Sequence, residues 1–239
     1  MGNDFAGRTR PGDLPRGWEG GDSGLRRYML RVYNYMAGGL MLTGVIAYGG
    51  AVSGVYASMA TTPLFWIVLL APLVLVVLLS WRIERMSAVA AQLCFWVYAA
   101  LVGLSLSGIF LVYTGESIAR VFVISAGTYG ATSIYGYTTR ADLSRFGSFL
   151  FMGLLGIVIA GLVNLVLAST ALQFAVSVIG ALVFTGLTAY DTQRIRDIYI
   201  ADEDDVVAGK KAIVGALALY LDFLNIFLML LRLLGRRRR

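Results

Sequence analysis

The sequence contains no histidine and only one cysteine, Cys94. Without imidazole groups a zinc hydrolase site is disfavoured, because histidine is the usual nitrogen ligand of zinc. Any proton-linked behaviour near neutral pH must then come from carboxyl or tyrosyl groups in unusual surroundings. A single cysteine also excludes an intrachain disulfide framework.

Charged residues are also scarce. They make up 14% of the 239 residues, whereas 58% are hydrophobic and the mean hydropathy is +0.75. Soluble domains carry about 25% charged residues. A water-soluble protein of this size needs polar residues to cover its surface, and this chain has too few of them. The solvent around it must therefore be lipid. The composition therefore predicts an all-α fold, a polytopic membrane helix bundle.

The gaps between charges indicate the membrane spans. Four stretches carry no charged residue, and a fifth carries only Asp222. These stretches are 32–81, 86–115, 121–139, 146–190 and 212–231. One crossing needs about 20 residues, so the first and fourth stretches each hold two helices. The sequence therefore predicts seven transmembrane helices.

The polar ends of the chain complete the predicted domain organisation. Residues 1–31 are rich in Gly, Pro and Arg and lack the apolar core of a signal peptide, so they are interpreted as a disordered cytoplasmic tail. Residues 32–235 form the transmembrane domain, and residues 236–239 form a basic C-terminal tail.

Basic residues predict the orientation in the membrane. With the N-terminus inside, the cytoplasmic segments before the last helix hold 14 Lys and Arg, whereas the outer loops hold only Arg120. The arginines at 232 and 236–239 disagree, because seven crossings would place them outside. The last helix therefore either crosses against this rule, which we favour, or re-enters and leaves its tail inside.

Two acidic residues lie within apolar stretches. Burial of an ionisable group in the membrane costs several kcal/mol, so each is a candidate functional residue. Asp222 is ten residues from the nearest flanking charges, and Asn225, three residues later, shares its helix face and is positioned to hydrogen-bond it. Asp191 closes the sixth predicted helix. The alternatives are an ordinary interfacial residue for Asp191 and a buried structural residue for Asp222.

If Asp191 and Asp222 meet, they would share a proton and act as a pH-sensitive latch, closed when protonated and loosened when both are charged. Arg82 or Arg85, at the inner end of the second predicted helix, would supply a countercharge. Carboxylate oxygens also suit calcium, so a calcium site at the two aspartates is part of this prediction. One difficulty is depth, because the predicted spans place Asp222 deeper than Asp191.

The acidic run at 202–205 lacks the alternate spacing and the glycine of a calcium loop, so we interpret it as a solvated loop.

Several segments resemble those of the Bax inhibitor-1 family, also called the transmembrane Bax-inhibitor-motif proteins. They are Tyr-Asp-Thr-Gln (190–193), Tyr-Leu-Asp-Phe-Leu-Asn (220–225) and Leu-Arg-Leu-Leu-Gly (231–235). Residues 135–143, Tyr-Gly-Tyr-Thr-Thr-Arg-Ala-Asp-Leu, resemble the bacterial members. The likeness extends from about residue 27 to residue 235.

The resemblance implies six helices around a central seventh, and a pH-sensitive calcium leak channel gated by paired aspartates at Asp191 and Asp222. In that family an arginine near the inner end of the second helix joins the latch, and Arg85 matches it best, with Arg82 as the second choice. Bacterial relatives are also linked to the control of membrane proteases. The implied location is the bacterial inner membrane, in contact with lipid and calcium and not with nucleic acid.

Two other functions compete with a channel. A non-conducting regulator would bind other membrane proteins, such as a membrane protease, through its helices. An intramembrane aspartyl protease would also need two carboxyl groups. Such proteases carry Gly-x-Gly-Asp and a later Pro-Ala-Leu element, whereas here Leu-Tyr-Leu precedes Asp222 and no proline follows Pro72. We therefore expect no enzymatic activity and no cofactor.

Overall fold

A computed structural model describes residues 17–201 and 203–238 of the chain. Within these residues the secondary structure is helical, and the only β pairing is an isolated bridge between Tyr113 and Arg237. The helices are, in chain order, α1 (Gly17–Val52), α2 (Val55–Ala60), α3 (Leu64–Arg82), the 3-10 helix η1 (Ile83–Arg85), α4 (Ala88–Leu106), α5 (Gly108–Val112), α6 (Gly115–Thr138), α7 (Ser144–Leu167), α8 (Thr170–Asp197) and α9 (Asp205–Leu234).

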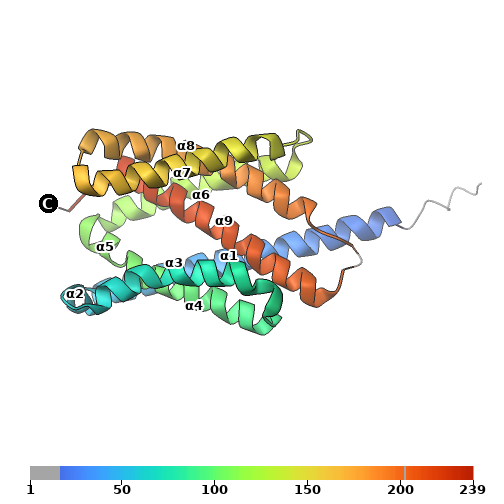
Figure 1. Cartoon of the computed structure of the whole chain (residues 1–239), viewed down its shortest axis with the longest axis horizontal. Coiled ribbons are helices and arrows are strands. Elements are labelled where there is room, and N and C mark those ends of the chain that lie inside the picture. Colours follow the sequence, from blue (N-terminus) through green and yellow to red (C-terminus); the bar gives the residue numbers. More distant parts are fainter. Residues whose placement is uncertain (1–16, 202, 239) are drawn as a thin grey trace, which may run out of the picture.

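α9 lies in the middle of the bundle, with α7 and α8 on one side and α3 and α4 on the other (Figure 1). It packs against α8, α1, α6 and α4. In its most apolar stretch 67% of the residues are buried, against 6% in α7. A helix that is apolar on every face is stable when other helices surround it. The prediction that the last helix is central is therefore confirmed.

The membrane-bundle architecture is confirmed, but only five of the seven predicted spans are found as long apolar helices in the described residues. Five stretches of the described chain are long and apolar enough to cross a bilayer: Ser23–Val52, Ala88–Val112, Ser144–Leu167, Thr170–Asp197 and Asp205–Leu234. α3 contributes a shorter apolar stretch, Leu64–Leu79. α6 is 24 residues long but is diluted by Gly, Ser, Thr and Tyr. The count of seven crossings stays a prediction.

The prediction of a disordered tail over residues 1–31 is wrong for its second half. α1 begins at Gly17, and residues 1–16 lie outside the described residues. Tyr28, Met29 and Val32 are all buried. Their spacing places them on one face of a helix, which packs against the bundle despite the arginines at 26, 27 and 31.

α9 is one unbroken helix of 30 residues and is long and apolar enough to cross a bilayer. Its C-terminal extension lies against the junction of α5 and α6. The Arg236 amide donates to the Ser117 hydroxyl at 2.8 Å, and the Thr114 amide donates to the Arg236 carbonyl at 3.0 Å. The Arg238 amide donates to the Val112 carbonyl at 2.9 Å. The basic tail is therefore held at the end of the bundle opposite the start of α1, which agrees with a full crossing.

The end of α8 holds the connection between α6 and α7. The side-chain oxygen of Gln193 accepts a hydrogen bond from the Leu143 amide at 2.8 Å, and its nitrogen donates to the Ala141 carbonyl at 2.8 Å. Arg196 donates to the Tyr137 carbonyl at 2.6 Å. Nearby, hydrogen bonds from the Ser144 hydroxyl and amide lower the pKa of the exposed Asp142 carboxyl. The α6–α7 connection is thus positioned by α8, the helix that carries Asp191.

We predict that Gln193→Ala destabilises the protein by about 1–3 kcal/mol, because two backbone groups lose a buried partner. Thermal unfolding in detergent would measure the change. The matched control is Gln173→Ala on the same helix, since the Gln173 side chain makes no hydrogen bond within the described residues. Equal melting temperatures for the two variants would contradict this prediction.

Candidate functional site

α8 and α9 pack closely because glycines lie at two points of their contact. A Cβ atom at Gly180 would lie 2.9 Å from the Met229 sulfur, and one at Gly215 would lie 3.1 Å from a methyl carbon of Ile195. Small residues let membrane helices approach one another in this way. The two close approaches set the antiparallel register of the pair, and the aspartates of both helices lie between them.

This register removes the predicted difference in depth between the aspartates. We counted the last span from residue 212, which placed Asp222 deeper than Asp191. α9 instead begins at Asp205, and its first turns continue past the end of α8 and pack against α1 (Figure 1). Because those turns do not run alongside α8, Asp222 reaches α8 at the level of Asp191.

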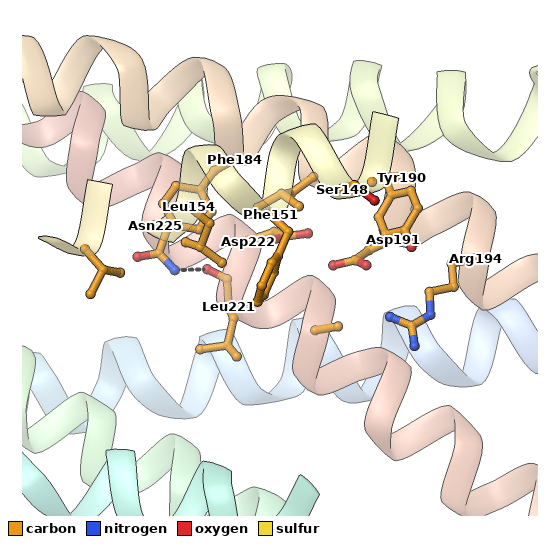
Figure 2. Close-up of a pocket in the computed structure, with 14 residues that line it drawn as sticks. Ser148, Phe151, Leu154, Phe184, Tyr190, Asp191, Arg194, Leu221, Asp222 and Asn225 are labelled. Atoms are coloured by element: carbon orange, nitrogen blue, oxygen red, sulfur yellow. Dashed lines mark hydrogen bonds between the residues drawn. The ribbon is translucent and has the colours of Figure 1, made fainter. Parts of the chain in front are cut away.

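The carboxyl groups of Asp191 and Asp222 point toward one another (Figure 2). A proton held by either group would lie between the two carboxyl groups. Asp222 is only 4% exposed, and its Oδ2 atom is buried with no hydrogen-bond partner in the described chain. Two carboxyl groups this close do not both ionise cheaply, so the pair behaves as one proton-binding unit.

Both aspartates line a cavity of about 630 Å³ between α7, α8 and α9. Its walls are mainly apolar, from residues such as Phe151, Leu154 and Phe184. Arg194, one turn after Asp191, lies at one end of the group and Asn225 at the other (Figure 2). The guanidinium of Arg194 is the cation whose charge acts on Asp191.

Arg82 and Arg85 are not brought to the aspartates. Both side chains are exposed, and neither lines the cavity. α3 packs against α4, and α9 lies between α3 and the pair formed by α7 and α8 (Figure 1). In this structure Arg194 therefore occupies the place that we expected for Arg82 or Arg85, and its spacing of three residues from Asp191 was visible in the sequence.

Asn225 lies near the pair but does not hydrogen-bond it as we predicted. Its side-chain nitrogen donates to the Leu221 carbonyl at 2.8 Å, one turn back along its own helix (Figure 2). Asn225 instead lines two cavities, the one that holds the aspartates and a second one of about 390 Å³.

The second cavity continues along the same helices. It shares Leu154, Val158, Phe184 and Asn225 with the first and extends to Arg232 near the C-terminal end of α9. The two cavities thus meet at a set of mostly apolar side chains. Together they follow the α7–α8–α9 contact from the aspartates toward the opposite end of the bundle.

A hydroxyl cluster on the α6 side of the site was not anticipated. The Ser133 hydroxyl lies 2.6 Å from that of Tyr33 and 3.1 Å from that of Thr192, the residue after Asp191. Tyr129 is buried beside them, within electrostatic range of both aspartates. Ser125, Tyr129 and Ser133 are buried and lie four residues apart along α6. This helical spacing places them on one side of the helix, which is polar and faces inward.

Among the described residues, no group of three or more Cys, Asp or Glu is arranged to hold a metal ion. Calcium takes 6–8 oxygen ligands in a stable site. Two carboxyl groups in a mainly apolar cavity provide fewer charged ligands than such a site uses, so the geometry does not resemble a resident calcium centre.

Comparison with known proteins identifies the chain. The family model described as "Inhibitor of apoptosis-promoting Bax1" matches residues 25–239. The chain belongs to the Bax inhibitor-1 family. The aspartates of this chain's Tyr-Asp-Thr-Gln and Tyr-Leu-Asp-Phe-Leu-Asn segments are the two that face one another.

Several bacterial relatives of this Bax inhibitor-1 protein match over most of their length. The uncharacterized protein RP147 of Rickettsia prowazekii is 51% identical over 218 residues, which cover 91% of this chain and 92% of the relative. The inner membrane protein YbhL of Escherichia coli is 49% identical over 220 residues, covering 90% and 94%. The uncharacterized protein YrjE of Lactococcus lactis is 35% identical over 216 residues, covering 89% and 92%.

Proposed function

We propose that this Bax inhibitor-1 family protein is a pH-sensitive cation leak of the bacterial inner membrane that conducts calcium. The location is inferred from the E. coli relative, which is named an inner membrane protein. The observation that carries the proposal is that the Asp191 and Asp222 carboxyl groups point toward one another inside a cavity of the bundle. As a leak the protein would carry out no chemical reaction and need no cofactor.

In the proposed closed state the two carboxyl groups share one proton, and the hydrogen bond between them ties α8 to α9. Loss of that proton leaves two like charges in a region of low dielectric constant, where their repulsion is strong. Arg194 offsets part of the charge on Asp191. No cation is among the described groups that act on Asp222, so its charge would be the less compensated of the two.

The two cavities between α7, α8 and α9 suggest the route. α7 packs closely against α8 and is little buried, so it would follow a small displacement of α8 at the level of the aspartates. Such a movement would widen the apolar region lined by Leu154, Val158 and Phe184, where the cavities meet. The small number of oxygen ligands suits an ion in transit better than one that is held.

Calcium flux into proteoliposomes tests this function. We expect flux above that of protein-free liposomes, and we expect it to rise as the pH is raised from about 6 to about 8, because the proposed latch loosens when its shared proton is lost. Wild-type flux that equals the protein-free background would contradict the leak and favour a non-conducting regulator. Cleavage of added membrane peptides that disappears in Asp191→Asn and Asp222→Asn would instead indicate a protease.

A further inference from the structure

A polar cavity of about 370 Å³ lies at the end of the bundle where α1 begins, away from the aspartate pair. It is formed between α1 and the segment that joins α8 to α9. The residues that matter for its chemistry are Arg27, Tyr28, Arg31, Tyr199, Glu203 and Asp205.

Two of these residues are cations without an acidic partner. Arg27 and Arg31 are exposed and form no ion pair within the described residues, and an ideal Cβ at Gly209 of α9 would lie 3.7 Å from the Arg31 Nη1 atom. Glu203 does not neutralise them, because it is bound to Lys211 at 2.6 Å. The cavity therefore presents two uncompensated guanidinium groups.

One carboxylate of the cavity is also without a partner. Asp205 is exposed at the first turn of α9 and forms no ion pair in the part of the chain that the structure describes. Its neighbour Asp204 caps the helix by accepting from the Val206 amide at 2.9 Å, so Asp205 is not needed for that role. The cavity thus offers an unpaired negative charge in addition to its two positive ones.

One buried hydroxyl of the cavity has no hydrogen-bond partner in the described chain. It is the hydroxyl of Tyr28, a residue that is 5% exposed. An unpaired buried hydroxyl is unfavourable, because water is lost and nothing replaces it. The ring of Tyr28 packs on that of Tyr199 at 5.4 Å between centroids. Gly24 allows this arrangement, since a Cβ there would overlap the Tyr199 hydroxyl.

The level of the cavity matches a lipid headgroup. Arg31 is the last charged residue before the uncharged stretch 32–81, so it marks the boundary between the apolar part of α1 and its polar start. Arginines at such a boundary reach the phosphate layer of the membrane. A ligand that enters from this layer arrives with its polar end at the level of the cavity.

We propose that this cavity binds a phosphodiester that carries a primary ammonium group, the headgroup chemistry of phosphatidylethanolamine. The guanidinium groups of Arg27 and Arg31 hold the phosphate oxygens, which are the acceptors that arginine suits best. The Tyr28 hydroxyl donates to the same phosphate. The ammonium group lies at the Asp205 carboxylate. All three unpaired features of the cavity are satisfied by this one ligand class.

The test is lipid binding to the full-length protein, measured by native mass spectrometry after delipidation and addition of defined lipids. We expect phosphatidylethanolamine to bind more tightly than phosphatidylglycerol or phosphatidylcholine. The double variant Arg27→Gln, Arg31→Gln is expected to weaken binding by about tenfold or more, since charge-assisted hydrogen bonds are lost. Arg26→Gln is the matched control, because Arg26 lines a different cavity, and it should bind as wild type.

Two conservative variants separate ligand binding from a structural role. Tyr28→Phe keeps the ring packing and removes only the hydroxyl, so it should weaken binding of phosphatidylethanolamine with no loss of thermal stability in detergent. Asp205→Asn should remove the preference over phosphatidylglycerol while phosphate binding remains. If Tyr28→Phe and the double arginine variant both bind as wild type, the proposal is overturned.

The source of the headgroup is decided with soluble glycerophosphoethanolamine. Competition by this compound at the affinity of the lipid would assign the site to a free phosphodiester, and binding of the lipid alone would assign it to the membrane. Binding of neither, or equal binding of all three lipids, would contradict the proposal. None of these measurements depends on calcium flux, so the inference stands or fails apart from the proposed leak.

Discussion

Asp222→Asn is expected to remove the pH response of calcium flux, so that flux near pH 8 stays within about twofold of flux near pH 6. An asparagine at 222 keeps the size of the side chain and remains neutral at every pH. Its amide nitrogen donates to the Asp191 carboxylate, which preserves the contact between α8 and α9 without a shared proton. The variant should therefore remain at the low-flux level of the protonated wild type.

Further variants show whether the two aspartates act as one unit. Asp191→Asn should have the same effect as Asp222→Asn, and the double variant should add little, because either change removes the same like-charge repulsion. Asp142→Asn is the matched control, since Asp142 is exposed, lies outside the cavity, and as asparagine still accepts from the Ser144 amide. A variant at 222 whose flux rises with pH as in the wild type would contradict the latch.

Gly136→Ala is expected to destabilise the bundle by about 1–3 kcal/mol through overpacking. A Cβ at this position of α6 would overlap the Ala189 carbonyl of α8, whose carbon atom would lie 2.9 Å away. A backbone group inside a helix does not rotate aside, so α6 and α8 must separate. Ser133, three residues earlier, would then lose its contact with Thr192 beside the aspartate pair.

Gly130→Ala is the control for this prediction, because it lies on the same helix and a Cβ there meets nothing within 4 Å. Thermal unfolding of both variants in detergent would compare them directly. We expect the melting temperature to fall for Gly136→Ala and to stay the same or rise slightly for Gly130→Ala, since alanine favours a helix over glycine. Equal losses would show that α6 and α8 are not packed as closely as described.

Asp191 and Asp222 illustrate how far the candidate site followed from local sequence. An acidic residue inside a long uncharged stretch is costly, so both positions stood out with no knowledge of the fold. Their meeting was a hypothesis that the predicted spans did not support, because those spans placed Asp222 deeper than Asp191. It depends on the extra turns of α9 before residue 212 and on the glycine contacts with α8, and neither feature has a signal in hydropathy.

Arg194 and Asn225 show where the sequence did not identify the partners of the aspartates correctly. Arg82 and Arg85 seemed the natural countercharges because they end an apolar stretch, yet the packing of α3 against α4 keeps them from the cavity. Asn225 shares a helix face with Asp222, but its amide finds a nearer acceptor on its own backbone. Spacing along the chain does not determine which of several cations lies near the aspartates. It also does not determine which acceptor the Asn225 amide uses.

By itself the sequence determined that this protein is a helical membrane bundle, because a chain with so few charges and such long apolar stretches satisfies its backbone in lipid only as helices. It also determined which residues are costly to bury. The tertiary structure alone decided which helices contact α9, which partners face Asp222, and where the cavities lie. These features depend on contacts between residues far apart in the chain. Hydropathy does not distinguish between the many possible arrangements of the helices, and side-chain packing selects one of them.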